Sequence, residues 1–147
     1  MAGIVHEGSC HCRAIGFRYH AVHDPGSWSV RACQCSFCRA HAAATTSDPH
    51  ARLEFVVERP SLLNTYRFAR RTADFLVCSR CGVYIGAMIQ TARGRFGIIN
   101  VHALSPIPAE VAAPVAIEYG TESLEQRIAR REQRWSPVMG TGIRPFA

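Results

Sequence analysis

The sequence predicts a mainly β fold with one short helix near its C-terminus. Between Arg13 and His102, apolar and polar residues alternate in several short stretches, and this two-residue period is typical of half-buried strands. Turn-forming residues occupy nearly every interval between these stretches. Only Ser123 to Trp135 has the spacing of a helix. Because 147 residues are the length of one ordinary domain, we expect a single domain over residues 1–147.

Three predicted strands fill the first part of the chain. Apolar and polar residues alternate over 13–20, 28–33 and 53–57. A turn sequence separates the first two strands, and Pro60 ends the third. Residues 40–48 are small and polar, which favours a loop or a short helical turn.

The second half of the chain continues the β pattern. Residues 62–68 alternate weakly, whereas 83–90 and 95–102 are strongly apolar. A short polar turn joins these two apolar segments, so they predict a hairpin. Prolines and small residues make 105–114 a surface connection, and 116–119 favours a short edge strand.

The predicted helix has a start signal and one apolar stripe. Ser123 and Gln126 have the spacing of a capping box. The thin stripe of Leu124, Ile128 and Trp135 favours packing on the sheet or at a subunit interface. The second of these alternatives would make the protein a homo-oligomer.

Composition and charge narrow the class of protein. Hydrophobic residues make up 48% of the chain and charged residues 19%, a globular composition that argues against disorder. The net charge of +6 is compatible with a nucleic-acid partner, but arginines around a thiolate–metal cluster or an anionic small substrate would give the same balance. No apolar run is long enough to span a bilayer, so we expect no membrane partner.

The cysteines indicate metal ligation rather than disulfides. The first residues lack the basic segment and apolar run of a secretory signal, so we expect a cytoplasmic protein with reduced thiols. The seven cysteines are an odd number and cluster in three motifs. These are C-x-C at Cys10 and Cys12, C-x-C-x-x-C at Cys33, Cys35 and Cys38, and C-x-x-C at Cys78 and Cys81.

Four of the cysteines match a closed structural zinc site, which takes four ligands and is usually assembled from two separate pairs. Cys10 and Cys12 supply one pair, and their side chains would leave an extended backbone on the same face. Cys78 and Cys81 supply the other pair. Gly82 follows them, where a positive φ lets backbone amides point at the sulfurs. A metal ion at this site would tie the start of the chain to its second half.

The remaining cysteines, Cys33, Cys35 and Cys38, form a set of three. In an extended backbone Cys33 and Cys35 leave on one face, and Cys38 returns to that face through a turn. Three protein ligands with a vacant fourth position distinguish a catalytic zinc site from a structural one. His41 is the alternative fourth ligand, and it would make a closed, structural site. We therefore expect two zinc ions per chain, with partial occupancy of the second site left open.

Two residues beside this set are candidates for catalysis. In a catalytic zinc site, an oxyanion that forms during the reaction needs a hydrogen-bond donor. Ser36 and Arg39 are the nearest candidates in the sequence, and Arg39 could also hold a substrate carboxylate through two parallel hydrogen bonds. Arg70 and Arg71 could hold one as well, although solvated surface charges explain them better.

Three cysteine-containing segments together resemble the glutathione-dependent formaldehyde-activating enzyme family, which includes centromere protein V. The segments are Gly8 to Cys12, Cys33 to Arg39 and Phe75 to Gly82. The resemblance runs from about residue 8 to about residue 104 and leaves 105–147 as a C-terminal extension. It implies a β-tent-like, zinc-binding fold of antiparallel sheets.

The resemblance also implies the roles of the cysteines and the reaction. The family holds a structural zinc and a catalytic zinc on equivalents of the seven cysteines, the structural one on Cys10, Cys12, Cys78 and Cys81 and the catalytic one on Cys33, Cys35 and Cys38. The implied activity joins formaldehyde to the thiol of glutathione, and the reverse direction is classed with carbon–sulfur lyases. We therefore expect a zinc-dependent, carbon–sulfur lyase-like enzyme that acts on a thiol adduct, with glutathione as the candidate thiol.

Two other functions compete with this enzyme. A non-catalytic zinc module could bind protein or nucleic acid, and it would need a continuous basic face. The arginines are instead scattered, except in 128–134, where glutamate and glutamine dilute them, so we do not expect nucleic acid. A small-thiol or metal-handling protein could use the open zinc site without turnover.

Overall fold

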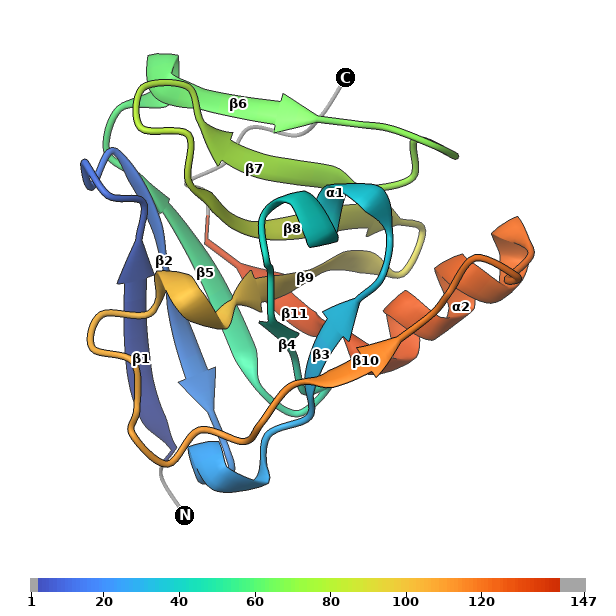
Figure 1. Ribbon diagram of the computed structural model, residues 1–147, viewed down its shortest axis with the longest axis horizontal. Helices are drawn as coiled ribbons and strands as arrows, with labels where there is room; N and C mark the ends of the chain where they lie inside the picture. Colours follow the sequence, from blue (N-terminus) through green and yellow to red (C-terminus); the bar gives the residue numbers. More distant parts are fainter. Residues whose placement is uncertain (1–2, 141–147) are drawn as a thin grey trace.

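The computed structural model describes residues 3–140, and most of the regular structure in this range is β (Figure 1). The strands are β1 (Ile4–Ser9), β2 (Ile15–Ala21), β3 (Val30–Cys33), β4 (Thr45–Thr46), β5 (Arg52–Val57), β6 (Leu63–Tyr66), β7 (Asp74–Cys78), β8 (Tyr84–Thr91), β9 (Gly94–Asn100), β10 (Val115–Ile117) and β11 (Ser136–Met139). The helices are α1 (Ser36–Ala40) and α2 (Leu124–Arg134), and short 3-10 turns lie at Pro25–Ser27, Pro60–Leu62 and Val101–Ala103.

The strands form one open sheet that is organised around β9. β8 runs antiparallel along one edge of β9, while β11 and β4 share the other edge. From β11 the sheet continues through β5 and β2 to β1, and from β4 it continues through β3 to β10. β7 and then β6 follow β8 on the remaining side. In Figure 1, β6 to β8 cross the top of the molecule, and α2 projects to the right beside β10.

This architecture confirms a mainly β fold with a short C-terminal helix. Most pairings are antiparallel, including the predicted hairpin of β8 and β9. Two pairings, β3 with β10 and β5 with β11, are parallel, so the sheet is not purely antiparallel, in contrast to what the family resemblance implies. In both pairs a long stretch of chain separates the partners, as parallel pairing requires. A single domain over residues 1–147 stays a prediction.

Neither β1 nor β11 is predicted by the sequence period. β1 is an edge strand whose side chains are only partly covered, so it shows no clear alternation of apolar residues. β11 contains Pro137, which usually argues against a strand, and it pairs with β5 and β9 only after the chain has passed through α2. Its place in the sheet therefore depends on tertiary contacts.

The two short cysteine segments also differ from the expected backbone. Cys10 to Cys12 form a turn after β1 rather than an extended segment, and the turn closes where the Arg13 N–H donates to the Cys10 carbonyl. Arg13 has a φ of +67°, which reverses the chain so that β2 can pair with β1. The sequence predicts a loop or a short helical turn over 40–48; the helix α1 instead begins earlier, inside the central cysteine cluster, and Thr45–Thr46 form the short strand β4.

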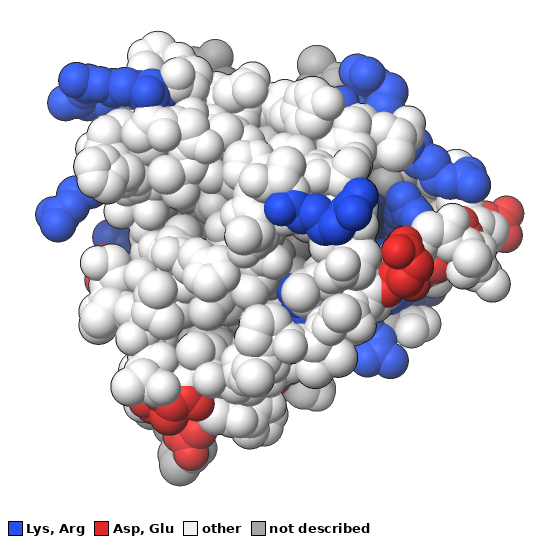
Figure 2. Space-filling view, viewed as in Figure 1, with Lys and Arg blue, Asp and Glu red and all other residues white. Residues whose placement is uncertain are grey.

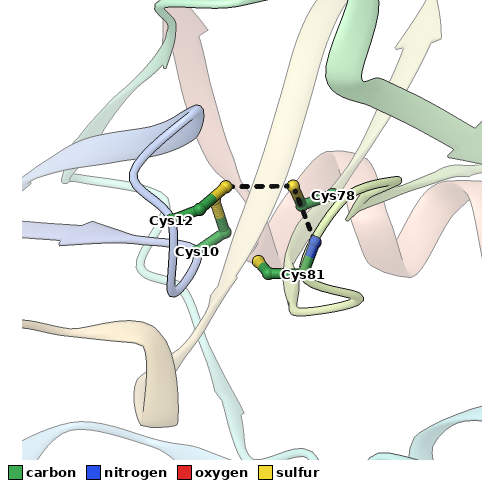
Figure 3. A group of neighbouring side chains, drawn as sticks. All are labelled: Cys10, Cys12, Cys78 and Cys81. Carbon is green, nitrogen blue, oxygen red and sulfur yellow. Dashed lines mark hydrogen bonds between the residues drawn. The ribbon is translucent and has the colours of Figure 1, made fainter.

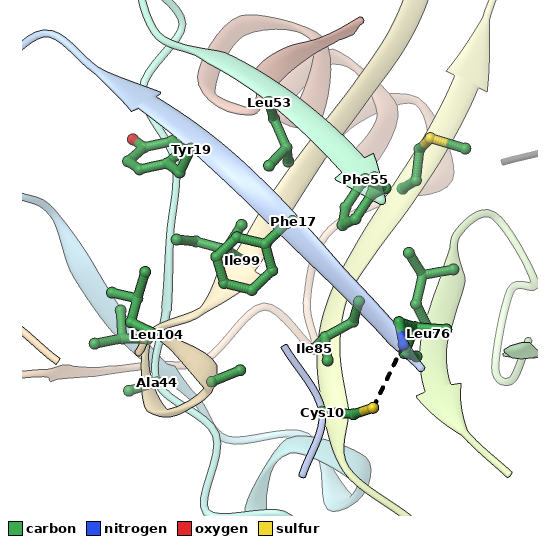
Figure 4. Close-up of a cluster of buried hydrophobic side chains, with 14 of the residues drawn as sticks. Cys10, Phe17, Tyr19, Ala44, Leu53, Phe55, Leu76, Ile85, Ile99 and Leu104 are labelled. Atoms are coloured by element: carbon green, nitrogen blue, oxygen red, sulfur yellow. Dashed lines mark hydrogen bonds between the residues drawn. The ribbon is translucent and has the colours of Figure 1, made fainter. Parts of the chain in front are cut away.

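The main hydrophobic core lies between β2, β5 and β9 (Figure 4). Phe17 and Tyr19 from β2 pack with Leu53 and Phe55 from β5, and Ile99 from β9 completes the group, all at most 2% exposed. Full burial of such side chains stabilises the fold by about 1.5–3 kcal/mol each. A second buried cluster, which includes Phe75, Tyr84 and Trp135, lies beside the central cysteines.

Helix α2 begins as predicted and buries part of the predicted stripe, whose face also includes Arg131, seven residues after Leu124. The Ser123 hydroxyl accepts a hydrogen bond from the Gln126 N–H, and the Gln126 side chain accepts one from the Ser123 N–H, which confirms the capping box. Leu124 is 40% exposed, whereas Arg131 is 8% and Trp135 is 4% exposed. The buried side of the helix therefore carries a guanidinium group. No helix in residues 3–140 is long and apolar enough to cross a membrane.

Candidate metal centres and the cavity beside them

The four-cysteine group joins two turns that are far apart in the sequence (Figure 3). Cys10 and Cys12 lie in the turn between β1 and β2, Cys78 ends β7, and Cys81 lies in the turn before β8. The Cys10 and Cys12 sulfurs are 3.8 Å apart, and those of Cys12 and Cys78 are 3.6 Å apart. All four sulfur atoms lie within 4.8 Å of one another.

These distances fit a tetrahedral zinc ion. Zinc–sulfur bonds of about 2.3 Å at tetrahedral angles place two sulfurs about 3.8 Å apart. The Ile15 N–H donates a hydrogen bond to the Cys10 sulfur, and the Cys81 N–H donates one to the Cys78 sulfur; both nitrogen–sulfur distances are 3.5 Å. Gly82 has the expected positive φ, +79°. The donor set and its supporting amides therefore suit a closed, four-thiolate metal site.

The three central cysteines converge through a strand end and a helix start. Cys33 is the last residue of β3, and Cys35 is the N-cap of α1. The Cys38 N–H donates to the Cys35 sulfur over 3.4 Å, and Cys38 itself is 5% exposed. The three sulfur atoms lie within 4.8 Å of one another, so this trio also suits a thiophilic metal ion.

The trio shares protons in a way that favours one thiolate. Hydrogen bonds from Cys33 and Cys38 lower the pKa of the Cys35 thiol. A hydrogen bond between Cys33 and Cys35 raises the pKa of the Cys33 thiol. Hydrogen bonds with Cys33 and Cys35 raise the pKa of the Cys38 thiol. A metal ion that binds here would displace the remaining protons, because thiolates are the ligands.

His41 does not join the trio. Among residues 3–140, no fourth ligand atom from histidine, cysteine, aspartate or glutamate groups with Cys33, Cys35 and Cys38. His41 is exposed at the end of α1, and its ring centroid lies 4.5 Å from that of Phe37. The ring therefore belongs to an aromatic cluster in this structure, and no histidine, cysteine, aspartate or glutamate within residues 3–140 supplies a fourth ligand for a metal at the trio.

A cavity of about 410 Å³ lies directly beside the trio. Its size is in the range of small-molecule sites. Aromatic residues form much of its wall, and α2 and the segments before β7 and after β10 complete it. The lining residues outside the trio that matter most are Phe68, Phe75, Tyr84, Trp135, Arg31, Arg70, Arg127, Arg130 and Arg131.

Five arginines line this cavity, and they differ in how their charges are paired. Arg127 and Arg130 are paired with Glu122, through contacts of 3.4 Å and 2.7 Å. The guanidinium of Arg130 also lies 3.6 Å from the centre of the Tyr119 ring. Arg31 and Arg131 are buried and pair with no carboxylate among the described residues. Burial lowers the pKa of Arg31, and it lowers the pKa of Arg131 to about 10, a value that leaves Arg131 cationic at neutral pH.

Of the arginines that line the cavity, only Arg70 was predicted from the sequence as a candidate for holding a carboxylate, and Arg71, the other member of that pair, does not line the cavity. Arg127, Arg130 and Arg131 have the i, i+3, i+4 spacing that places side chains on one face of a helix. Nothing in the sequence singles out Arg31 or Tyr84. The phenol of Tyr84 is buried, its hydroxyl has no hydrogen-bond partner among residues 3–140, and burial raises its pKa well above the usual value.

The structure places the two sequence-based donor candidates elsewhere. Ser36 and Arg39 are exposed, and neither lines the large cavity. Arg39 instead lines a smaller cavity of about 270 Å³, together with His102, Cys33 and Cys38. Cys33 and Cys38 therefore line both cavities, whereas Cys35 lines only the larger one.

Charged side chains are unevenly spread on the face shown in Figure 2. Arginine and acidic side chains lie together over the α2 side, while much of the remaining face is uncharged. The basic residues on this face are separated by uncharged surface and, on the α2 side, by acidic side chains, so they form no continuous band.

Fold and site together define a class: a mainly β protein with two cysteine groups that could hold metal ions, one closed and one open to a cavity. Residues 5–122 match the model of the glutathione-dependent formaldehyde-activating enzyme family, and the chain belongs to that family. The match extends past residue 104 and ends just before α2.

A solved structure is similar over most of the chain. It is the crystal structure of a Rhodobacter sphaeroides protein, with a TM-score of 0.55 and 27% sequence identity. The similarity covers 75% of this chain and 97% of that chain.

Proposed function

We propose that this chain is a zinc-dependent enzyme that joins formaldehyde to a thiol, with glutathione as the thiol, and that also catalyses the reverse carbon–sulfur cleavage. The observation that carries the proposal is the trio of sulfur atoms in a cavity wall, which no fourth histidine, cysteine, aspartate or glutamate of the described residues joins. Membership of the family supports glutathione and formaldehyde as the reactants. The closed four-cysteine group would hold the second, structural zinc.

The trio and the residues around it would have different roles in this reaction. Zinc bound by the trio would supply an open position for the substrate sulfur and lower the pKa of its thiol. The apolar side chains of Phe75 and Trp135 would limit water around the sulfur, which strengthens the electrostatic effects there. The arginines would favour the thiolate and the oxyanion through their positive charge.

The bond changes balance without a further reactant. The sulfur lone pair forms the new carbon–sulfur bond, and the π electrons of the carbonyl move to oxygen. The oxygen then takes up one proton, equal to the one that the thiol lost. Arg39, with Ser36 near it in sequence, remains a donor candidate that would act from the smaller cavity.

The state of the cysteines supports a reducing compartment. All seven are free, and none forms a disulfide. We therefore keep the cytoplasm as the proposed location, since thiols stay reduced there.

Metal analysis and X-ray absorption on anaerobically purified protein test the proposal. We expect two zinc ions per chain, and we expect added glutathione to bring one more sulfur to the second zinc at about 2.3 Å. Cys35→Ser is the matched variant, because it should lose the second zinc and this response. An unchanged spectrum with glutathione would contradict the proposal and favour a non-catalytic zinc module.

Turnover is measured as a rate above the spontaneous reaction. Exchange spectroscopy with ¹³C-formaldehyde and glutathione should show faster interconversion of the free and adduct forms with the wild-type protein than with Cys35→Ser. Equal rates for both proteins would remove the enzyme assignment.

A further inference from the structure

The cavity beside the trio has an excess of positive charge. Its lining contains five arginines, Arg31, Arg70, Arg127, Arg130 and Arg131, and one acidic residue, Glu118. Glu118 is exposed, and its carboxylate accepts a hydrogen bond from the Gly120 N–H. Glu122 outside the lining neutralises part of the charge through its bonds with Arg127 and Arg130. The excess therefore rests mainly on the other arginines.

Arg131 is the most unusual of these arginines. It is 8% exposed, and one terminal N–H group donates to the Thr72 hydroxyl over 2.7 Å. Its Nε is fully buried and has no hydrogen-bond partner among the described residues. The guanidinium carbon lies 4.9 Å from the centre of the Trp135 ring, which holds the side chain in place without neutralising it.

Arg31 approaches the same cavity from β3. It is 7% exposed, and its guanidinium donates a hydrogen bond to the neutral Ser47 hydroxyl at 2.7 Å. No carboxylate forms an ion pair with it among residues 3–140. Two buried guanidinium groups thus face one cavity while each bonds to a neutral hydroxyl.

Buried cations without a counter-ion are costly, so they call for an explanation. The unused groups of Arg131 and Arg31 are donors only, and their missing partner must therefore be an acceptor, most effectively an anion. A carboxylate matches the planar geometry of a guanidinium and can accept two parallel hydrogen bonds.

We propose that Arg131, assisted by Arg31, binds a carboxylate of the substrate, so that the preferred substrate is a thiol that also carries a carboxylate. This inference rests on the proposed function, in which the thiol of the substrate binds the metal ion held by the trio. Arg131 lies on α2, beyond the residues 5–122 that match the family model. The discrimination between charged and neutral thiols is thus assigned to a helix outside the part that defines the family.

A rival explanation is that the arginines serve only to offset the charge of three thiolates. In that case the loss of Arg131 would weaken metal binding and would affect charged and neutral thiols alike. If Arg131 binds a carboxylate, its loss would affect carboxylate-bearing ligands selectively and leave the metal content unchanged.

Calorimetric binding of S-methylglutathione separates the two explanations without turnover. For zinc-loaded wild type, we expect tighter binding of S-methylglutathione than of its diester, in which the carboxylates are blocked. In Arg131→Gln, affinity for the acid should fall roughly 10- to 100-fold, the range of one lost hydrogen-bonded charge contact. Arg134→Gln is the matched control, because Arg134 is exposed on the same helix and does not line the cavity. Equal losses for acid and diester would overturn the proposal.

A second variant guards against simple unfolding. Arg131→Met removes a buried charge that has no counter-ion and keeps an apolar stem, so its melting temperature should equal or exceed that of wild type. A melting temperature well below that of wild type would show that Arg131 is structural and would overturn the proposal.

Turnover distinguishes this inference from the proposed function. If wild type accelerates adduct formation and Arg131→Gln slows the reaction of glutathione and of a neutral thiol equally, the carboxylate site is wrong while the enzyme assignment stands. If wild type binds S-methylglutathione through Arg131 but accelerates no reaction, the proposed function is wrong while the carboxylate site stands.

Discussion

The buried hydroxyl of Tyr84 lowers the free energy of unfolding where the structure places it. It is buried and has no hydrogen-bond partner among residues 3–140, and leaving such a group unsatisfied costs about 1–3 kcal/mol. We expect Tyr84→Phe to raise the melting temperature of the metal-loaded protein by roughly 2–4 °C for each kcal/mol recovered. Calorimetric melts measure this change.

Tyr19→Phe is the matched control for this prediction. Tyr19 is also buried, but its hydroxyl interacts with Ser136, so its removal should lower the melting temperature. A fall for Tyr84→Phe as large as that for Tyr19→Phe would mean that the Tyr84 hydroxyl has a partner that the loaded protein supplies.

The two cysteine groups should respond differently to single substitutions. Cys81 belongs to the group that ties the β1–β2 turn to the β7–β8 turn, so we expect Cys81→Ser to lose the fold at moderate temperature. Cys35 belongs to a group within one short segment, so Cys35→Ser should keep the fold and lose one metal ion per chain. Thermal melts with metal analysis test both, and complete unfolding of Cys35→Ser would weaken a catalytic assignment for the trio.

At the scale of elements, α2 is held in part by one acidic residue. A side-chain hydrogen bond from Arg130 lowers the pKa of Glu122 below its usual 4.5. A carboxylate with a lowered folded-state pKa stabilises the fold above its unfolded pKa, and this contribution is lost as the pH falls through the lower folded value. We therefore expect Glu122→Gln to be less stable than wild type at neutral pH and equally stable at pH values well below 4.5.

Denaturant melts over this pH range measure the difference. Glu125→Gln is the control, because Glu125 is exposed near the start of the same helix and makes no ion pair among the described residues. A stability difference for Glu122→Gln that stays constant with pH would contradict the ionic role of Glu122.

Elements with a strong internal signal were predictable. The alternation of β2, β5, β8 and β9 follows from burial of one side of each strand, and the capping box marks the start of α2. β1 and β11 lack such a signal because their positions depend on partners from distant parts of the chain. The Cys10–Cys12 turn was missed for a related reason, since its shape follows from the pairing of β1 with β2.

At the scale of the whole molecule, removal of metal should occur in two stages. The trio opens into a cavity, whereas the four-cysteine group is closed by its own four sulfurs. We expect a chelator to remove the first metal ion without unfolding and the second only together with loss of tertiary structure. Parallel records of zinc release and near-ultraviolet circular dichroism test this order. Release of both ions in one unfolding step would show that the trio also stabilises the fold.

The sequence by itself determined the chemistry that depends on local spacing. Cysteine motifs, the glycine after the last of them, strand alternation and the helix cap each depend on residues a few positions apart, so they can be read along the chain. The tertiary structure decided what faces the trio. Arg31 and Arg131 are a hundred residues apart in the sequence, and only the docking of α2 brings them to one cavity and leaves both without a carboxylate partner among the described residues. Burial of a charge depends on all the elements packed around it, and no local spacing encodes it.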